Sequence, residues 1–318
     1  MTPATGARPA RELLARAASR QSVPPGDGRS GAAFERVTGD HVHRPYLAWQ
    51  AGIMDRAPGC LDHTVVAMEV EGADGDAVLT MLMHDVGSFL VPSGDTVVPS
   101  GQHAGFIAHM AALSAAFWEW DDDIGLTTMA QRLRIFAPDN IAGELTADEV
   151  PAPIAAAAAG WTALPRRSPL LAHAAQLVHD RPEVITGPLA RTPRTFVHGD
   201  WKMGNLGTHP DGRTILLDWA LPGSGPACWD LCWYLALNRA RLPEPKEAAI
   251  ARFQAELETR GISTGGWWQP QLDLCMIGIV ATFGWEKALG DAGELKWWED
   301  AVARAAARRG IPVGPASR

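Results

Sequence analysis

The spacing of apolar residues changes near residue 95 of this 318-residue chain. Before that point, short apolar runs or alternating patterns predict strands over 32–37, 63–70 and 77–83. Beyond it, apolar residues mostly recur every three or four positions. This spacing predicts a series of helices, over 102–120, 168–179, 230–241, 244–259, 269–289 and 294–309. The order predicts an α+β fold with two unequal lobes, because the regular strand–helix alternation of a doubly wound sheet is missing.

The same pattern suggests how the chain is divided. Residues 1–27 contain Pro24-Pro25-Gly26 and lack clear periodicity, which predicts a flexible tail. Residues 28–95 form the small sheet-bearing lobe, which also includes a predicted helix over 46–56. Residues 96–318 form the large, mainly helical lobe. Within it, 151–159 (Pro-Ala-Pro-Ile and five alanines) is either a connector or an Ala-rich helix.

Two strand-like runs interrupt the helical region, and polar residues follow both. Phe196-Val197 leads into His198-Gly199-Asp200, with Asn205 five residues later, and Ile215–Leu217 leads into Asp218. The turn residues His209-Pro210-Asp211-Gly212 between the runs predict that they pair as a hairpin. Transfer of a phosphoryl group from a magnesium nucleotide needs a carboxylate to orient a hydroxyl, and an amide and a second carboxylate for the metal. Each acid alone is also typical of a turn, but the joint spacing favours this chemistry.

This motif resembles the aminoglycoside phosphotransferase and choline kinase group, a branch of the protein-kinase-like fold. The resemblance includes Gly225-Pro226 and Trp229-Asp230-Leu231 downstream. It extends more weakly over residues 60–290, through His84-Asp85-Val86 and the helix segment Met110–Trp118. Two positions depart from bacterial members: Ser114 stands where His is common, and His84 stands where Arg is common.

The resemblance implies a role for each motif residue. Asp200 would be the catalytic base, and Asn205 and Asp218 would bind Mg²⁺ on the phosphates of ATP or GTP. His198 would hold the loop in place. Apart from the resemblance, the position of Lys202 inside the loop makes it either a residue that faces substrate or phosphate or a solvated lysine. Ionised carboxylates and neutral amide oxygens are ligands that suit Mg²⁺.

The nucleotide-binding part of the small lobe departs from the family pattern. Gly26-Asp27-Gly28-Arg29-Ser30-Gly31 matches G-x-G-x-x-G, a weak signal that makes Ser30 a candidate nucleotide contact, together with Asp85. The family places a lysine on the following strand, yet no lysine occurs before Lys202. Arg44 is a candidate replacement, although its planar fork is not equivalent to an ammonium group.

The missing lysine leaves three hypotheses open. The first is a phosphotransferase acting on a hydroxyl of a small molecule. The second is a pseudokinase-like binding module, and the third is a biosynthetic enzyme that uses Asp200 as a general base without nucleotide. For the first, the resemblance implies an antibiotic, an aminoglycoside-like compound, an amino alcohol or a natural-product intermediate as acceptor. Asp230, Trp285 and Glu286 are its candidate contacts, although helix tryptophans and acids are more often core and solvated residues.

Composition and net charge indicate which kinds of partner and which cellular environment this chain suits. A hydrophobic content of 47% with 20% charged residues predicts a folded protein, and the net charge of −8 disfavours nucleic acid. No apolar run is long enough for a membrane helix. The four cysteines, none in a CxxC pair, predict buried thiols in a reducing cytoplasm. His41 and His43 predict a solvated loop rather than a metal site. The oligomeric state stays open.

Overall fold

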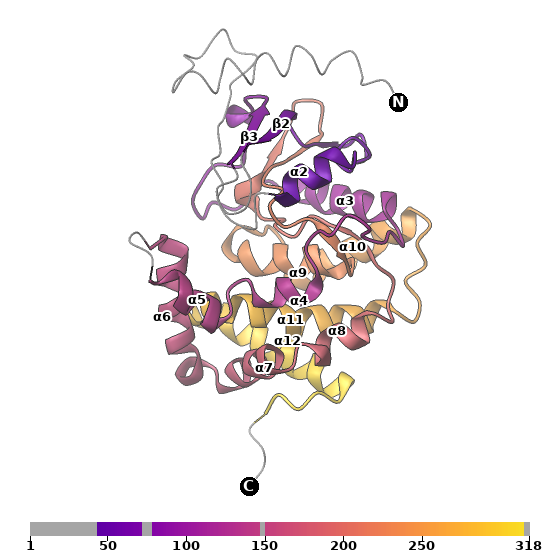
Figure 1. Cartoon of the computed structure of the whole chain (residues 1–318). Coiled ribbons are helices and arrows are strands. Elements are labelled where there is room, and N and C mark those ends of the chain that lie inside the picture. Colours follow the sequence, from indigo (N-terminus) through magenta and orange to yellow (C-terminus); the bar gives the residue numbers. More distant parts are fainter. Residues whose placement is uncertain (1–42, 72–77, 147–149, 315–318) are drawn as a thin grey trace.

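The computed structural model describes residues 43–71, 78–146 and 150–314 (Figure 1). The predicted tail, the strand over 32–37, the Gly-rich segment with Ser30, and His41 lie outside these residues. Figure 1 shows a small lobe containing strands and one helix beside a much larger helical lobe, which confirms the α+β fold. The boundary at residue 95 stays a prediction.

The small lobe is built around one antiparallel hairpin. Strands β2 (Val65–Glu71) and β3 (Val78–Met83) pair with Val70 opposite Leu79, and helix α2 (His43–Gln50) packs on β2. Both strands were predicted to within two residues. The helix predicted over 46–56 ends at Gln50 because Gly52 adopts a left-handed φ of +70°, which stops the helical hydrogen-bond ladder.

The large lobe contains all six predicted helices. They are α3 (Ser100–Ala116), α7 (Pro169–Asp180), α9 (Cys228–Leu237), α10 (Lys246–Thr259), α11 (Trp268–Leu289) and α12 (Ala292–Arg309). Residues 151–159 belong to a helix as well, α6 (Ala152–Arg167). Three short helices were not predicted: α4 (Met129–Arg134), α5 (Pro138–Glu144) and α8 (Glu183–Leu189).

Helix α11 is the centre of the large lobe. It is buried along most of its length and packs against α6, α7, α9 and α12 (Figure 1). Its surroundings explain its composition, because a helix surrounded by other helices is apolar on every face. None of the helices in the described part of the chain is long and apolar enough to span a membrane.

The strand pairing of the motif corrects the sequence prediction. The turn at 209–212 joins β5 (Leu206–Thr208) to β6 (Thr214–Leu216), and β6 also pairs with the two-residue strand β1 (Leu61–Asp62). Strand β4 (Thr195–Val197) pairs instead with β7 (Gly223–Gly225). The predicted hairpin between 196–197 and 215–217 is therefore wrong, because the chain leaves β4 through a loop and starts a new strand at Leu206. Both pairings bring the ends of β4 and β6 into one region.

Gly160 provides a test of the contact between α6 and α11. A Cβ atom at Gly160 would lie 2.3 Å from the carbonyl oxygen of Trp285, which belongs to the α11 backbone and cannot rotate away. We expect Gly160→Ala to lower the free energy of unfolding by about 1–3 kcal/mol in denaturant titrations, the usual cost of overpacking.

Gly187 on α8 is the matched control, because nothing lies within 4 Å of its would-be Cβ atom. Gly187→Ala should be neutral or stabilising by up to about 1 kcal/mol, through the higher helix propensity of alanine. Equal stability of the two variants would show that α6 and α11 are not packed this closely.

Candidate functional site

The polar loop after β4 is held by two side chains of the α9 segment. The backbone N–H groups of His198 and Gly199 donate to the two carboxylate oxygens of Asp230, at 2.9 and 2.8 Å. At the other end of the loop, the N–H of Met203 donates to the side-chain oxygen of Asn238, just after α9. Asp230 and Asn238 are both buried. The loop that contains Asp200 is therefore fixed at both ends by the most buried part of the large lobe.

Asp200 is 5% exposed, and both of its carboxylate oxygens accept hydrogen bonds. The indole Nε1 of Trp233 donates to Oδ1 at 2.8 Å, and the side-chain amide of Asn205 donates to Oδ2 at 2.7 Å. The ammonium group of Lys202 lies 2.5 Å from Oδ2. Burial raises the pKa of Asp200, and the hydrogen bonds and the Lys202 charge oppose that rise. Hydrogen bonds thus fix the orientation of the Asp200 carboxylate, and burial and the Lys202 charge together set its pKa.

Asn205 contacts this carboxylate directly, and Asp218 acts on it electrostatically. The Asn205 amide also donates to the backbone oxygen of Asp200, so its own side-chain oxygen faces away from both contacts. Asp218 follows β6 with a left-handed φ of +60°, which only a small share of non-glycine residues adopt and which turns the chain directly after the strand. Asp218 is exposed.

These residues fit a magnesium ion. The Asp218 carboxylate raises the pKa of Asp200, which shows that the two negative charges are close enough to repel each other. A divalent cation would relieve this repulsion, and the available atoms are the hard oxygens that Mg²⁺ prefers. No group of three or more His, Cys, Asp or Glu side chains within the described ranges could hold a metal. Protein ligands here would therefore be few, as is usual for Mg²⁺ bound together with phosphates.

His198 is an uncharged support of the loop. Burial lowers its pKa to about 3, with the Asp218 carboxylate acting in the opposite direction, so the imidazole is neutral at physiological pH. Its Nδ1 accepts a hydrogen bond from the N–H of Asp200 at 3.3 Å, and its ring packs edge-on against Trp219 with centroids 5.0 Å apart. Both contacts suit a structural role and give no route for proton transfer at this ring.

The family assignment follows from sequence comparison. The model of the phosphotransferase enzyme family matches residues 101–264, which is 164 of the 318 residues and includes the whole loop region. The chain belongs to this phosphotransferase family. The resemblance seen in His198–Leu231 is thereby confirmed. A search of curated proteins found no significant match.

Solved structures similar to this phosphotransferase are distant in sequence. A microcompartment-associated aminopropanol kinase is 12% identical (86% of this chain, 84% of that one, TM-score 0.49). The aminoglycoside phosphotransferase APH(3'')-Id from Streptomyces rimosus, solved with ADP and streptomycin, is 19% identical (86% and 98%, TM-score 0.49). The choline kinase LicA from Streptococcus pneumoniae is 11% identical (94% and 99%, TM-score 0.41).

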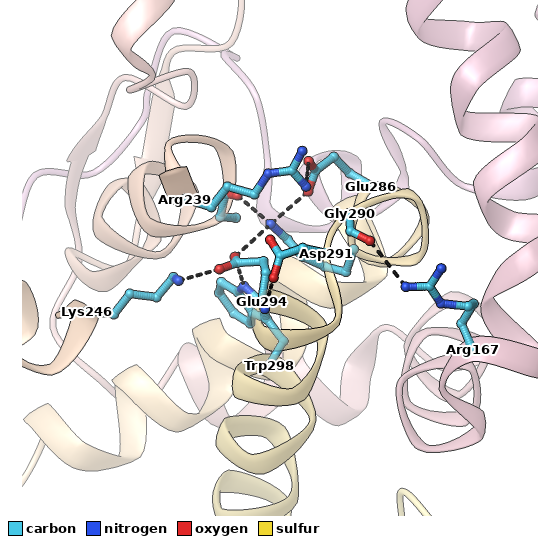
Figure 2. A network of polar contacts seen from close by, with 10 residues as sticks. Arg167, Arg239, Lys246, Glu286, Gly290, Asp291, Glu294 and Trp298 are labelled. Atoms are coloured by element: carbon cyan, nitrogen blue, oxygen red, sulfur yellow. Dashed lines mark hydrogen bonds and ion pairs between the residues drawn. The ribbon is translucent and has the colours of Figure 1, made fainter. Parts of the chain in front are cut away.

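Asp230, Trp285 and Glu286, the three predicted acceptor contacts, all make contacts within the fold of this phosphotransferase. Both oxygens of Asp230 bind the loop backbone, as described above. Trp285 is a packing residue of α11, with its ring 5.5 Å from that of Phe136. Glu286 pairs with Arg239 and Lys287 in a network between α9, α11 and α12 (Figure 2). In the structure these three side chains contact neighbouring helices and the loop, and their role as acceptor contacts stays a prediction.

The candidate nucleotide contacts that the structure describes are Arg44 and Asp85. Arg44, in α2, lines a cavity of about 740 Å³ with residues of α4 and α5. Asp85 is exposed and accepts a hydrogen bond from the N–H of Gly87 at 3.0 Å, which is a local turn contact. Ser30 lies outside the described residues. Their roles stay predictions.

Sequence reasoning missed three residues that position the loop: Trp233, Asn238 and Arg132. Trp233 lies one helical turn after Asp230 on α9, so it faces the same loop. That spacing was a usable signal once Asp230 was recognised. Asn238 and Met203 are 35 residues apart in the sequence, and Arg132 and Leu221 are 89 apart. No local sequence pattern predicts these two contacts.

The pKa of Asp230 predicts how the free energy of unfolding should change with pH. Burial raises it to about 6, from an ordinary value of 3.8. A carboxyl group with a raised folded-state pKa contributes stability below its ordinary pKa and loses it as the pH rises through the folded pKa. The wild type should therefore lose about 3 kcal/mol of this contribution between pH ~4 and pH ~7, whereas Asp230→Asn should not. Denaturant unfolding of both proteins across this range measures the difference.

Asp211→Asn is the control for the sign. The hydrogen bond from Arg213 lowers the pKa of Asp211, so its contribution should grow with pH rather than fall. A pH-independent difference between wild type and Asp230→Asn would mean that Asp230 is not a buried, titrating anchor.

Proposed function

We propose that this protein transfers the γ-phosphoryl group of ATP or GTP to a hydroxyl of a small molecule. The observation that supports the proposal most is the arrangement around Asp200. A buried carboxylate is oriented by Trp233 and Asn205, and it lies within electrostatic reach of a second carboxylate, Asp218. Phosphoryl transfer depends mainly on positioning and electrostatics, and these groups provide both.

In this proposal Asp200 is the base. Its oxygens are fixed, so an acceptor hydroxyl bound within hydrogen-bond distance would be aligned with the phosphate before reaction. Burial raises the pKa of Asp200 towards the working pH, which makes the carboxylate a better proton acceptor. The Trp233 and Asn205 hydrogen bonds keep it ionised and prevent rotation.

The remaining polar residues would serve the nucleotide. Asn205 and Asp218 would hold Mg²⁺, which neutralises phosphate charge when bound. Lys202 is the first lysine of the chain, and its side chain is 36% exposed. We assign to Lys202 the phosphate-facing charge that a small-lobe lysine supplies in the family, because an ammonium group on a flexible stem can reach from Asp200 to a neighbouring phosphate.

The cavity beside Arg44 is our candidate for the part of the acceptor that is remote from the reacting hydroxyl, because Asp200 is not among the residues that line it. Its volume of about 740 Å³ suits a small molecule, and its lining combines apolar side chains such as Ile135 and Phe136 with polar ones such as Asn140. Phe136 packs on Phe283, with ring centroids 5.7 Å apart, and Phe283 packs on Trp233 at 4.6 Å. One aromatic layer thus separates this cavity from the residue that orients Asp200.

We propose as acceptor an antibiotic, an aminoglycoside-like compound, an amino alcohol or a natural-product intermediate, in antibiotic resistance or in natural-product biosynthesis. We also place the reaction in the cytoplasm, where the four free cysteines would stay reduced.

Asp200→Asn tests the proposal. Wild-type protein with Mg²⁺ and ATP or GTP is incubated with a panel of hydroxyl compounds, and phosphorylated product is measured by mass spectrometry. We expect Asp200→Asn to lower kcat by about 100- to 10,000-fold, the range for loss of a general base. Nucleotide binding should survive in this variant, as seen in thermal-shift titration. Asp218→Asn and Asn205→Ala should instead lose the Mg²⁺-dependent part of the shift.

The alternative hypotheses give different results. A thermal shift with nucleotide but no transfer to any acceptor would support a pseudokinase-like module, which the missing small-lobe lysine favours. Product formation that continues without nucleotide and Mg²⁺ would support a biosynthetic enzyme that uses Asp200 alone. No shift and no product would reject the proposal.

Lys202→Met tests the source of the phosphate-facing charge. The substitution should lower kcat by about 100-fold, the typical loss for one electrostatic contact to the transition state. It should also move the acidic limb of the pH–rate profile upwards, because the Lys202 charge lowers the pKa of Asp200. Lys202→Arg should keep the pH profile and recover part of the rate. Lys296→Met, which removes an exposed lysine paired with Asp300 on α12, is the control and should leave both unchanged.

A further inference from the structure

Arg132, on α4, is one of the largest fully buried side chains, with 0% exposure. Its Nη1 donates to the carbonyl oxygen of Leu221 at 2.6 Å. Its Nε and Nη2 have no hydrogen-bond partner among the described residues. A buried guanidinium with unpaired donors costs free energy, so packing alone does not account for an arginine at this position.

The guanidinium occupies space that two glycines leave open. Gly199 has a left-handed φ of +85°, and a Cβ atom there would lie 2.1 Å from Nη1 of Arg132 and 2.3 Å from the Leu221 oxygen. A Cβ atom at Gly223 would lie 3.1 Å from Nη2. Arg132 is therefore enclosed between the loop that contains Asp200 and the segment that follows Asp218.

The location is informative because protein kinases have arginine between the His and Asp of this motif, in the sequence H-R-D. Here Gly199 stands at that position in the sequence, and the guanidinium beside it belongs to Arg132 of α4. The pKa of Arg132 falls to about 10 through burial, so it remains charged at neutral pH. Asp230 and Asp122 oppose this fall, and Arg44 adds to it.

We propose that Arg132 is a positioning residue that keeps Asp200 and Asp218 in register, by binding the Leu221 carbonyl and filling the space beside Gly199. The proposal rests on the proposed function of these two carboxylates. It extends that function to the acceptor side, because Ala130, Gln131 and Arg134 of the same helix line the cavity beside Arg44. Helix α4 thus contacts the acceptor cavity through one set of residues and the reacting loops through Arg132.

Electrostatics gives a readout that a purely structural role would not change. Asp230 accepts hydrogen bonds from the N–H groups of His198 and Gly199. The Arg132 charge lowers the pKa of Asp230, and the Asp200 charge raises it. Loss of the Arg132 charge should let Asp230 take up a proton at higher pH, which weakens its hold on the loop. The acidic limb of the pH–rate profile should then move upwards.

The experiment compares Arg132→Met, Arg132→Lys and Leu133→Ala. Leu133 is the neighbouring residue on α4 and is buried against α11, away from the loops, so it reports on damage to the helix alone. Arg132→Met should lower kcat by about tenfold or more, raise the Mg²⁺ concentration for half-maximal rate, and shift the acidic limb. Arg132→Lys should restore the pH profile but only part of kcat. Leu133→Ala should lower Tm without moving the Mg²⁺ dependence or the pH profile.

Hydrogen exchange of the purified proteins separates this inference from the proposed function, because it needs no transfer reaction. Arg132→Met should speed amide exchange in the peptides covering 198–205 and 218–222. Leu133→Ala should speed it in α4 instead. If Arg132→Met exchanges like Leu133→Ala and leaves the Mg²⁺ dependence unchanged, Arg132 only fills space and the inference is overturned. Absence of transfer by the wild type, with the exchange result as expected, would reject the proposed function alone. If Arg132→Met does not fold, the Mg²⁺ dependence of the rate and the hydrogen exchange are measured on Arg132→Lys instead.

Discussion

The whole arrangement depends on one buried carboxylate, Asp230, that accepts two backbone hydrogen bonds from the loop containing Asp200. Burying a carboxylate is unfavourable, and burial raises its pKa to about 6. The two N–H groups and the nearby Arg132 charge offset part of that cost. A carboxylate on the first turn of a buried helix has little conformational freedom, so its hydrogen bonds hold the loop in a fixed position relative to α9. Asp200 follows the second bonded residue directly and is placed by this contact.

The second constraint is aromatic packing. Trp233 orients Asp200 through its Nε1 and packs on Phe283, which packs on Phe136. Rings have few rotatable bonds and large contact areas, so a row of them transmits position well. Phe283 also interrupts the helical geometry of α11, with φ of −125°. Asp200 is therefore aligned by the core of the large lobe, and Phe136 at the cavity beside Arg44 belongs to the same packed unit.

The sequence was informative wherever a pattern repeats over ten or more residues. Six of the seven helices that have ten or more residues in the described part of the chain, and strands β2 and β3, followed from periodicity. Helices α4, α5 and α8 have six or seven residues, which is fewer than two full turns. The pairing of β4 was mispredicted because three-residue strands leave little signal. The motif made Asp200, Asn205 and Asp218 candidate site residues, since their spacing is local. The contacts of Arg132 with Leu221 and of Asn238 with Met203 were not predictable, because each joins residues far apart in the sequence. The packing of Trp285 and the ion pairs of Glu286 could not be predicted, because tryptophans and acids on a helix look alike in sequence whether they face a ligand or another helix.

Charge balance bears on the missing small-lobe lysine. Three carboxylates, Asp200, Asp218 and Asp230, influence one another near the loop, and the cations acting on them are Lys202 and Arg132. Lys202 acts on Asp200 and Arg132 on Asp230, so within the described residues Asp218 holds the surplus negative charge. A bare phosphate would be repelled by such a site, whereas a phosphate that arrives with its metal would be attracted. In the proposed function, a bound metal would supply part of the positive charge that a small-lobe lysine supplies elsewhere, and Lys202, which pairs with Asp200 in the structure, would supply the rest.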